Sequence, residues 1–172
     1  MRVPDSPYQL TIEAAWRGRI ATGELKFDAA QEEAVSVLQA FAGQLGTHPP
    51  QPQGLFARLI KRLPSGVVNG LYLYGDVGRG KTMLMDMFFA TIPYARKRRV
   101  HFHSFMLEVH ERLHRLQQSH ANEVLPGLAR EMAKETGLLC FDEFHVSNIA
   151  DAMILGRLFS ALFQAGVVIV AT

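Results

Sequence analysis

NGLYLYGDVGRGKT, residues 69–82, begins with a short apolar run, continues through a glycine-rich turn and ends on a Lys-Thr pair that opens a helix. Gly75, Gly80, Lys81 and Thr82 satisfy the pattern G-x-x-x-x-G-K-[ST]. Glycines at this spacing let the backbone approach phosphate oxygens so closely that its N–H groups can point at them. The stretch therefore predicts a phosphate-binding loop between a strand and a helix.

The residues of this loop have distinct predicted roles. The helix that begins near Gly80 presents its unpaired N–H groups and positive dipole end to the same phosphates. Lys81 is predicted to reach the β- and γ-phosphates as a catalytic residue, and the Thr82 hydroxyl to ligate Mg²⁺, so ATP and Mg²⁺ are the expected cofactors. The predicted nucleotide contacts are Gly75, Asp76, Val77, Gly78, Arg79, Gly80, Lys81, Thr82 and Met83.

Strands and helices are predicted to alternate along the chain from this loop onward. Such alternation favours an α/β fold, in which a parallel sheet is covered by helices. The predicted strands are residues 71–74, 99–103, 138–141 and 167–171, and the predicted helices are residues 81–90, 105–118, 128–135 and 149–164.

The part of the chain before the loop is predicted to be mostly helical. Residues 8–41 form two helical pieces; Asp28 and Gln31 have the spacing of a capping box for the second, with Gly43 as its stop. We interpret these helices as a packing element in preference to a contact with the nucleotide base. The predicted domains are an N-terminal helical segment (1–43), a Pro- and Gly-rich linker or exposed loop (44–54), and a nucleotide-binding core (55–172) that opens with a short helix at 55–63.

A second nucleotide-binding signal lies in LLCFDE, residues 138–143. Its four apolar residues predict a buried strand that delivers two carboxylates to its carboxyl end, where open α/β sheets bind ligands. Asp142 is the predicted Mg²⁺ ligand, and Glu143 the predicted base that polarises the attacking water. The next helix has its own predicted cap in Asn148, so Asp142 is not needed for capping.

A rival pattern is His110-Glu111-Arg112-Leu113-His114, which fits the zinc-protease motif H-E-x-x-H, with His120 at the place of a third ligand. That extended motif requires a glycine at position 117, where this chain has Gln117. On a continuous helix, His120 would face about 120° to 160° away from the first pair. We therefore predict no zinc site and interpret His110 and His114 as partly packed helix residues.

Residues 142–145 also spell a D-E-x-H box, which with a phosphate-binding loop is typical of helicases, and Ala171-Thr172 is similar to part of a later helicase motif. No aromatic and basic platform for bases accompanies it. The basic run 96–99 is interpreted as a solvated loop before a strand. Nucleic acid is therefore not expected as a partner, and a nucleic-acid-dependent ATPase remains the alternative.

Composition places this chain among compact cytoplasmic domains. It has 172 residues, 48% of them hydrophobic, and a formal charge of only +2, which does not indicate a nucleic-acid-binding surface. The single cysteine, Cys140, cannot form an internal disulfide, which favours a reducing compartment. The sequence contains no transmembrane segment or targeting peptide of the usual kinds.

Three segments resemble the ZapE cell-division ATPases of bacteria and their mitochondrial relatives, a branch of the AAA+ superfamily. They are GLYLYGDVGRGKTMLMDMFF, RVHFHSFMLEVHERLH and LLCFDEFHVSNIADAMILGRLFSALFQAGVVIVAT. The resemblance implies a P-loop NTPase fold of the AAA+ type, with Walker A at residues 75–82 and Walker B at residues 138–143. It also implies that the full-length protein is an ATPase that forms a hexamer or another homo-oligomer and acts on a protein partner, FtsZ in bacteria.

The resemblance further implies that more of the fold follows Thr172. A polar sensor, a fifth strand, an arginine finger and a helical lid would then lie beyond it. With the strand order 5-1-4-3-2, the strand before the phosphate-binding loop would be an edge of the sheet in this chain. Two functions are thus expected: ATP hydrolysis by the full-length protein, or nucleotide binding without turnover by this chain alone.

Overall fold

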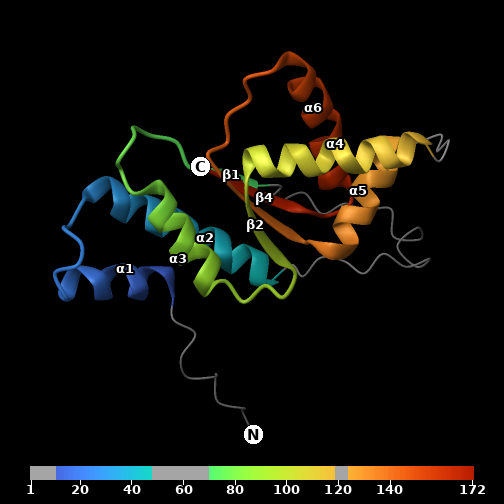
Figure 1. Cartoon of the computed structure of the whole chain (residues 1–172). Helices are drawn as coiled ribbons and strands as arrows, with labels where there is room; N and C mark the ends of the chain where they lie inside the picture. Colours follow the sequence, from blue (N-terminus) through green and yellow to red (C-terminus); the bar gives the residue numbers. More distant parts are fainter. Residues whose placement is uncertain (1–10, 48–69, 119–123) are drawn as a thin grey trace, which may run out of the picture. The chain divides into compact units, whose positions relative to one another are not determined.

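The computed structural model describes residues 11–47, 70–118 and 124–172, and the chain divides into two compact units. The first unit comprises Met1–Thr47 with Tyr74–Pro93, and the second comprises His48–Leu73 with Tyr94–Thr172. We describe each unit by itself (Figure 1). The predicted helix at 55–63 and most of the predicted linker lie outside the described residues.

The first unit is a small helical cluster that carries the glycine-rich loop. Trp16, Leu38 and Phe88 are almost fully buried in it, and the Phe41 and Phe88 rings lie 6.0 Å apart. The apolar stripes of the helices therefore pack on one another, as predicted for a packing element. The helices are α1 (Ile12–Ala21), α2 (Ala29–Thr47) and α3 (Lys81–Thr91).

Two predictions for α2 are corrected. The helix does not stop at Gly43 but continues to Thr47. A glycine inside a helix costs only about 1 kcal/mol, and Leu45, beyond it, is buried. Asp28 does cap the helix, since its Oδ1 accepts from the Ala30 N–H at 2.9 Å, but the Gln31 side chain does not complete a capping box and turns toward other partners.

In its described residues, the second unit is a parallel four-stranded sheet with three helices, in the strand order β1-β4-β3-β2. All three strand pairs are parallel, as predicted for an α/β fold. This order places β1 at an edge of the described sheet, as the resemblance implied. The elements are β1 (Gly70–Tyr72), β2 (Lys97–His101), α4 (Phe102–Gln118), α5 (Val124–Glu135), β3 (Leu138–Asp142), α6 (Ile149–Gln164) and β4 (Val168–Ala171).

One face of this sheet forms the core with α4, α5 and α6 (Figure 1). Leu139 and Phe141 of β3 point into it, and they are paired in register with Ile169 and Ala171 of β4. Side chains alternate along a strand, so Cys140 and Asp142 belong to the opposite face. The sequence of β3 thus separates an apolar side from the side that bears the predicted metal ligand.

Several predicted boundaries shift by a few residues. Helix α6 has the predicted bounds, and the Asn148 side chain accepts from the Ala150 N–H at 2.8 Å, which confirms the predicted cap. The strand predicted at 99–103 begins and ends two residues earlier, because Phe102 already opens α4 and is buried. Helix α5 begins before its predicted start and includes Pro126, which the first turn of a helix tolerates.

Candidate functional site

The glycine-rich loop links β1 to α3 through backbone conformations that favour glycine. Gly78 has φ 80° and Gly80 has φ 82°, in the left-handed region that side chains with a Cβ rarely adopt. Gly80 is also the residue that immediately precedes α3. Glycines at these two positions let the loop turn into the helix so that the first helical N–H groups face the loop.

Lys81 lies over this loop. Its Nζ donates to the carbonyl oxygens of Gly75 at 2.8 Å and Asp76 at 2.9 Å. The amine is therefore held against the turn in which phosphate binding was predicted. Thr82, in the first turn of α3, is exposed, so its hydroxyl is accessible to a ligand.

Residues of the N-terminal helical segment contact this loop, and the sequence did not predict these contacts. Gln31 donates from Nε2 to the carbonyl of Arg79 at 3.1 Å, and Asp28 forms an ion pair with the Arg79 guanidinium at 3.2 Å. The only signal in the sequence was the capping-box spacing, which placed both residues at a helix start but did not indicate their partner.

Asp142 ends β3 in the second unit, and one of its carboxylate oxygens is already paired. Arg99 donates to Oδ2 from Nε at 2.9 Å and also from Nη2. The other oxygen, Oδ1, is buried and has no hydrogen-bond partner among the residues that the structure describes. A buried acceptor without a donor is costly unless a ligand completes it.

Glu143 follows with unusual backbone geometry. Its φ is 53°, and it is the one non-glycine residue with positive φ in the described part of the chain. Such a conformation costs about 1–3 kcal/mol and concentrates at functional sites. The turn is held from both sides, because Phe144 N–H donates to the Thr172 carbonyl at 2.8 Å and Thr172 N–H to the Phe141 carbonyl at 3.1 Å.

The residues present suit a magnesium ion. Mg²⁺ takes oxygen ligands, and a carboxylate is its usual protein partner. In the second unit, the buried Oδ1 of Asp142 is such an oxygen. In the first unit, the exposed Thr82 side chain carries a hydroxyl oxygen. The two residues belong to different compact units.

The basic run 96–99 is not a solvated loop, so that interpretation was wrong. Residues 97–99 lie in β2 and are half-buried. Arg96 donates to the Ala133 carbonyl at 3.0 Å, and Arg98 is paired with Glu108 of α4. These arginines satisfy acceptors inside the unit, so the run is a structural feature rather than a basic patch.

Among the described residues, no group of three or more metal-ligating side chains includes His110 or His114. Both are exposed rather than partly packed, which corrects our interpretation. His110 Nε2 lies 2.8 Å from Asp151 Oδ1 on α6, and His114 Nε2 lies 3.0 Å from the Gln118 amide. His120 lies outside the described residues.

Cys140 is fully buried in β3. Burial raises the pKa of its thiol to about 12. At neutral pH the side chain is therefore a protonated, apolar part of the core.

None of the described helices is long and apolar enough to span a membrane.

Comparison with known proteins identifies relatives of this chain. The chain is 47% identical over 157 residues to the cell division protein ZapE of Escherichia coli, an alignment that covers 84% of this chain and 40% of that protein. It is 53% identical over 113 residues to lactation elevated protein 1 homolog B of Danio rerio, which covers 60% of this chain and 22% of that protein. The chain thus spans less than half the length of these relatives. No solved structure matches it.

The family model named AFG1-like ATPase matches residues 10–172. That range includes α1, α2 and α3 of the first unit, the glycine-rich loop, and the whole described sheet. This chain therefore belongs to the AFG1-like ATPase family.

Proposed function

We propose that this chain binds Mg-ATP through residues 75–83 and that the protein of which it forms part hydrolyses ATP. The observation that carries the proposal is the loop itself: glycines with positive φ lead into α3 while Lys81 is held over the turn. N–H groups at a helix start, with a lysine beside them, form an anion site suited to a polyphosphate. The family assignment supports the same chemistry.

In this proposal each side chain has a limited task. Lys81 releases its loop carbonyls and places its positive charge on the β- and γ-phosphates. Glu143, exposed at the end of β3, orients the attacking water and accepts its proton. Asp142 would hold Mg²⁺ through its buried Oδ1. The Thr82 hydroxyl keeps its sequence-predicted role as a Mg²⁺ ligand of the phosphate-binding loop. Bound Mg²⁺ supplies neutralisation of the phosphate charge.

We further propose that hydrolysis is coupled to the remodelling of a protein partner in cell division by a cytoplasmic homo-oligomer. The basis is similarity to a protein named for cell division. FtsZ is the partner that the sequence resemblance implies. No observation in the described residues favours a helicase. The side chains of Arg96, Arg98 and Arg99, which would have contributed to its basic patch, are engaged within the second unit.

A second candidate function is nucleotide binding without turnover by this chain alone. It is the alternative that the sequence resemblance implied, and the chain spans 40% of the length of the ZapE relative. Measuring ATP turnover by this chain and by a longer form that extends past Thr172 separates the two. Turnover by the longer form alone supports the second candidate for this chain, and turnover by neither form contradicts the proposed hydrolysis.

A further inference from the structure

Gln31 of α2 joins helix α1 to the glycine-rich loop. Its Oε1 accepts a hydrogen bond from the Trp16 Nε1 at 3.2 Å, and its Nε2 donates to the Arg79 carbonyl at 3.1 Å. The indole N–H can only donate and the carbonyl can only accept. The orientation of the Gln31 amide is therefore fixed by its two partners.

The Gln31 amide is anchored on the side away from the loop. Trp16 is 1% exposed and packs against the Phe27 ring at a centroid distance of 5.9 Å. The loop, in contrast, has little packing of its own, and the Val77 side chain is 99% exposed. A donor tied to the core thus contacts an exposed turn.

Two further contacts converge on the same part of the loop. Asp28, three residues before Gln31, forms an ion pair with the Arg79 side chain at 3.2 Å. A Cβ placed on Gly80 would lie 2.9 Å from Gln31 Nε2, closer than real Cβ contacts allow. A side chain at position 80 would therefore displace the Gln31 amide from its present position.

The hydrogen bond to Arg79 also fixes the next N–H group. In a trans peptide the carbonyl and the following N–H point in opposite directions. Since Gln31 holds the Arg79 carbonyl toward α2, the N–H of Gly80 must point away from α2. Without that restraint, the peptide between these two residues could rotate, because glycine accepts both signs of φ.

From this geometry we propose that Gln31 is a positioning residue for the phosphate-binding loop. It holds the Arg79–Gly80 peptide so that the Gly80 N–H stays directed at a nucleotide phosphate. This inference rests on the proposed binding of Mg-ATP. It gives the N-terminal helices a part in nucleotide binding beyond packing, without a contact to the base.

The chain offers a matched control in Gln39. This residue lies on the same helix, is also half-buried, and its Oε1 accepts from the Ile12 N–H at 3.0 Å. Like Gln31 it links α2 to α1, but its hydrogen bond does not involve the loop. Gln31→Glu and Gln39→Glu therefore add the same charge and keep the acceptor for α1, and only the first removes a donor to the loop.

The test is the dissociation constant for Mg-ATP, measured by calorimetry on the full chain and its variants. Gln31→Met is added because it removes the donor without adding a charge. We expect Gln31→Glu and Gln31→Met to bind about tenfold more weakly than wild type and Gln39→Glu to bind normally. We also expect Mg-ATP to change the fluorescence of Trp16, the single tryptophan, in wild type and in Gln39→Glu but not in Gln31→Met.

Three results would overturn the inference. The first is binding by Gln31→Met within about twofold of wild type, which would attribute any loss in Gln31→Glu to charge. The second is equal weakening in Gln39→Glu, which would indicate a general effect of the helix pair. The third is an unchanged nucleotide response of Trp16 fluorescence in Gln31→Met. Failure of wild type itself to bind Mg-ATP would instead contradict the proposed function on which the inference rests.

Discussion

Arg99 on β2 directs two guanidinium nitrogens, Nε and Nη2, at a single oxygen of Asp142 on β3. The Asp142 side chain is only 7% exposed and that of Arg99 is 22% exposed, so the pair is largely removed from water. Contact with one oxygen leaves Oδ1 of the same carboxylate without a hydrogen bond in the described residues. Arg99 thus holds the carboxylate in place through Oδ2. The other oxygen, Oδ1, is the one that we assign to Mg²⁺.

Replacing Arg99 with Met leaves the buried Asp142 carboxylate without its counter-ion. We expect the free energy of unfolding to fall by about 2–3 kcal/mol, less than for a fully buried pair because Arg99 retains some contact with water. Denaturant unfolding measures this change. In an Asp142→Asn background the same replacement should cost clearly less, and an equal cost in both backgrounds would show that the pair is not the source of the loss.

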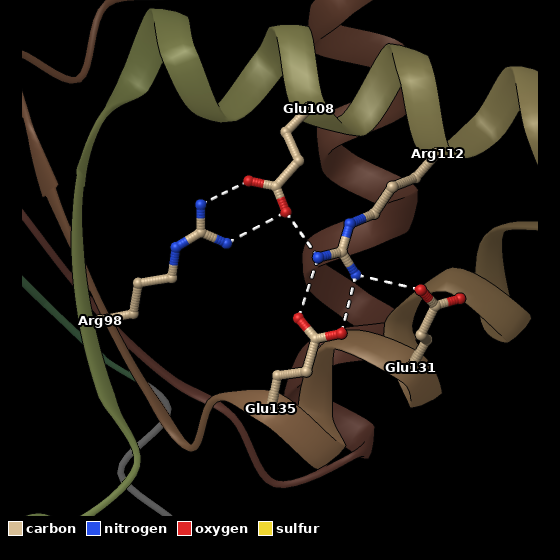
Figure 2. Close-up of polar contacts among 5 residues, drawn as sticks. All are labelled: Arg98, Glu108, Arg112, Glu131 and Glu135. Carbon is tan, nitrogen blue, oxygen red and sulfur yellow. Dashed lines mark hydrogen bonds and ion pairs between the residues drawn. The ribbon is translucent and has the colours of Figure 1, made fainter.

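A network of five charged side chains joins β2, α4 and α5 (Figure 2). Glu108 is paired with both Arg98 and Arg112, and Arg112 also contacts Glu131 at 3.1 Å and Glu135 at 2.9 Å. The hydrogen bond from Arg98 lowers the pKa of Glu108 below its usual 4.5. The carboxyl therefore stabilises the fold when ionised.

The expected effect of Glu108→Gln depends on pH. Because the pKa of Glu108 is lower in the folded state, its stabilisation is complete above about pH 4.5 and is lost as the pH falls toward the folded-state pKa. We expect Glu108→Gln to lower the free energy of unfolding by about 1 kcal/mol at pH 7, and the difference from wild type to shrink below pH 4.5. Exposed Glu111→Gln on the same helix is the control; a difference for Glu108→Gln that is independent of pH would contradict the assignment.

Because Glu143 has a positive φ, we predict that its replacement by glycine stabilises the fold but removes activity. Gly adopts this conformation without strain, so Glu143→Gly should raise the free energy of unfolding by about 1 kcal/mol. In the longer form of the protein it should also abolish ATP turnover, as should Glu143→Gln, while both retain Mg-ATP binding. Thermal unfolding and a phosphate-release assay measure the two effects. Unchanged turnover in Glu143→Gln would remove Glu143 as the base.

Cys140 should be inert in the folded protein. Thiol reagents attack the thiolate, and burial raises the thiol pKa to about 12. At pH 8 we expect a chromogenic disulfide reagent to leave the native chain unmodified over minutes and to titrate one thiol per chain after unfolding in guanidinium. Rapid labelling of the native chain would indicate that β3 opens or that Cys140 is accessible.

The sequence predicted the features that depend on local patterns. The glycine-rich loop, the apolar run of β3, and the cap at Asn148 each have a spacing that specifies a backbone geometry, and the structure confirms those elements. The stop at Gly43 was wrong because burial of Leu45 outweighs the helix cost of one glycine.

Contacts between residues distant in sequence could not be predicted in this way. Arg99 looked like part of a solvated run because its partner, Asp142, lies 43 residues further along the chain. Gln31 looked like half of a capping box because its partner, the Arg79 carbonyl, lies 48 residues away and belongs to the backbone. The local sequence pattern does not indicate either partner, because each pair of residues is brought together only by the sheet or by the packing of the helices.

The most direct test of this account is calorimetric titration of the chain with ATP in the presence and absence of Mg²⁺, alongside Lys81→Ala. We expect wild type to bind one nucleotide more tightly with Mg²⁺, and Lys81→Ala to lose at least about tenfold in affinity, because the lysine charge on the phosphates is removed. Absence of binding by folded wild type, or equal affinity of Lys81→Ala, would contradict a phosphate-binding role for residues 75–82.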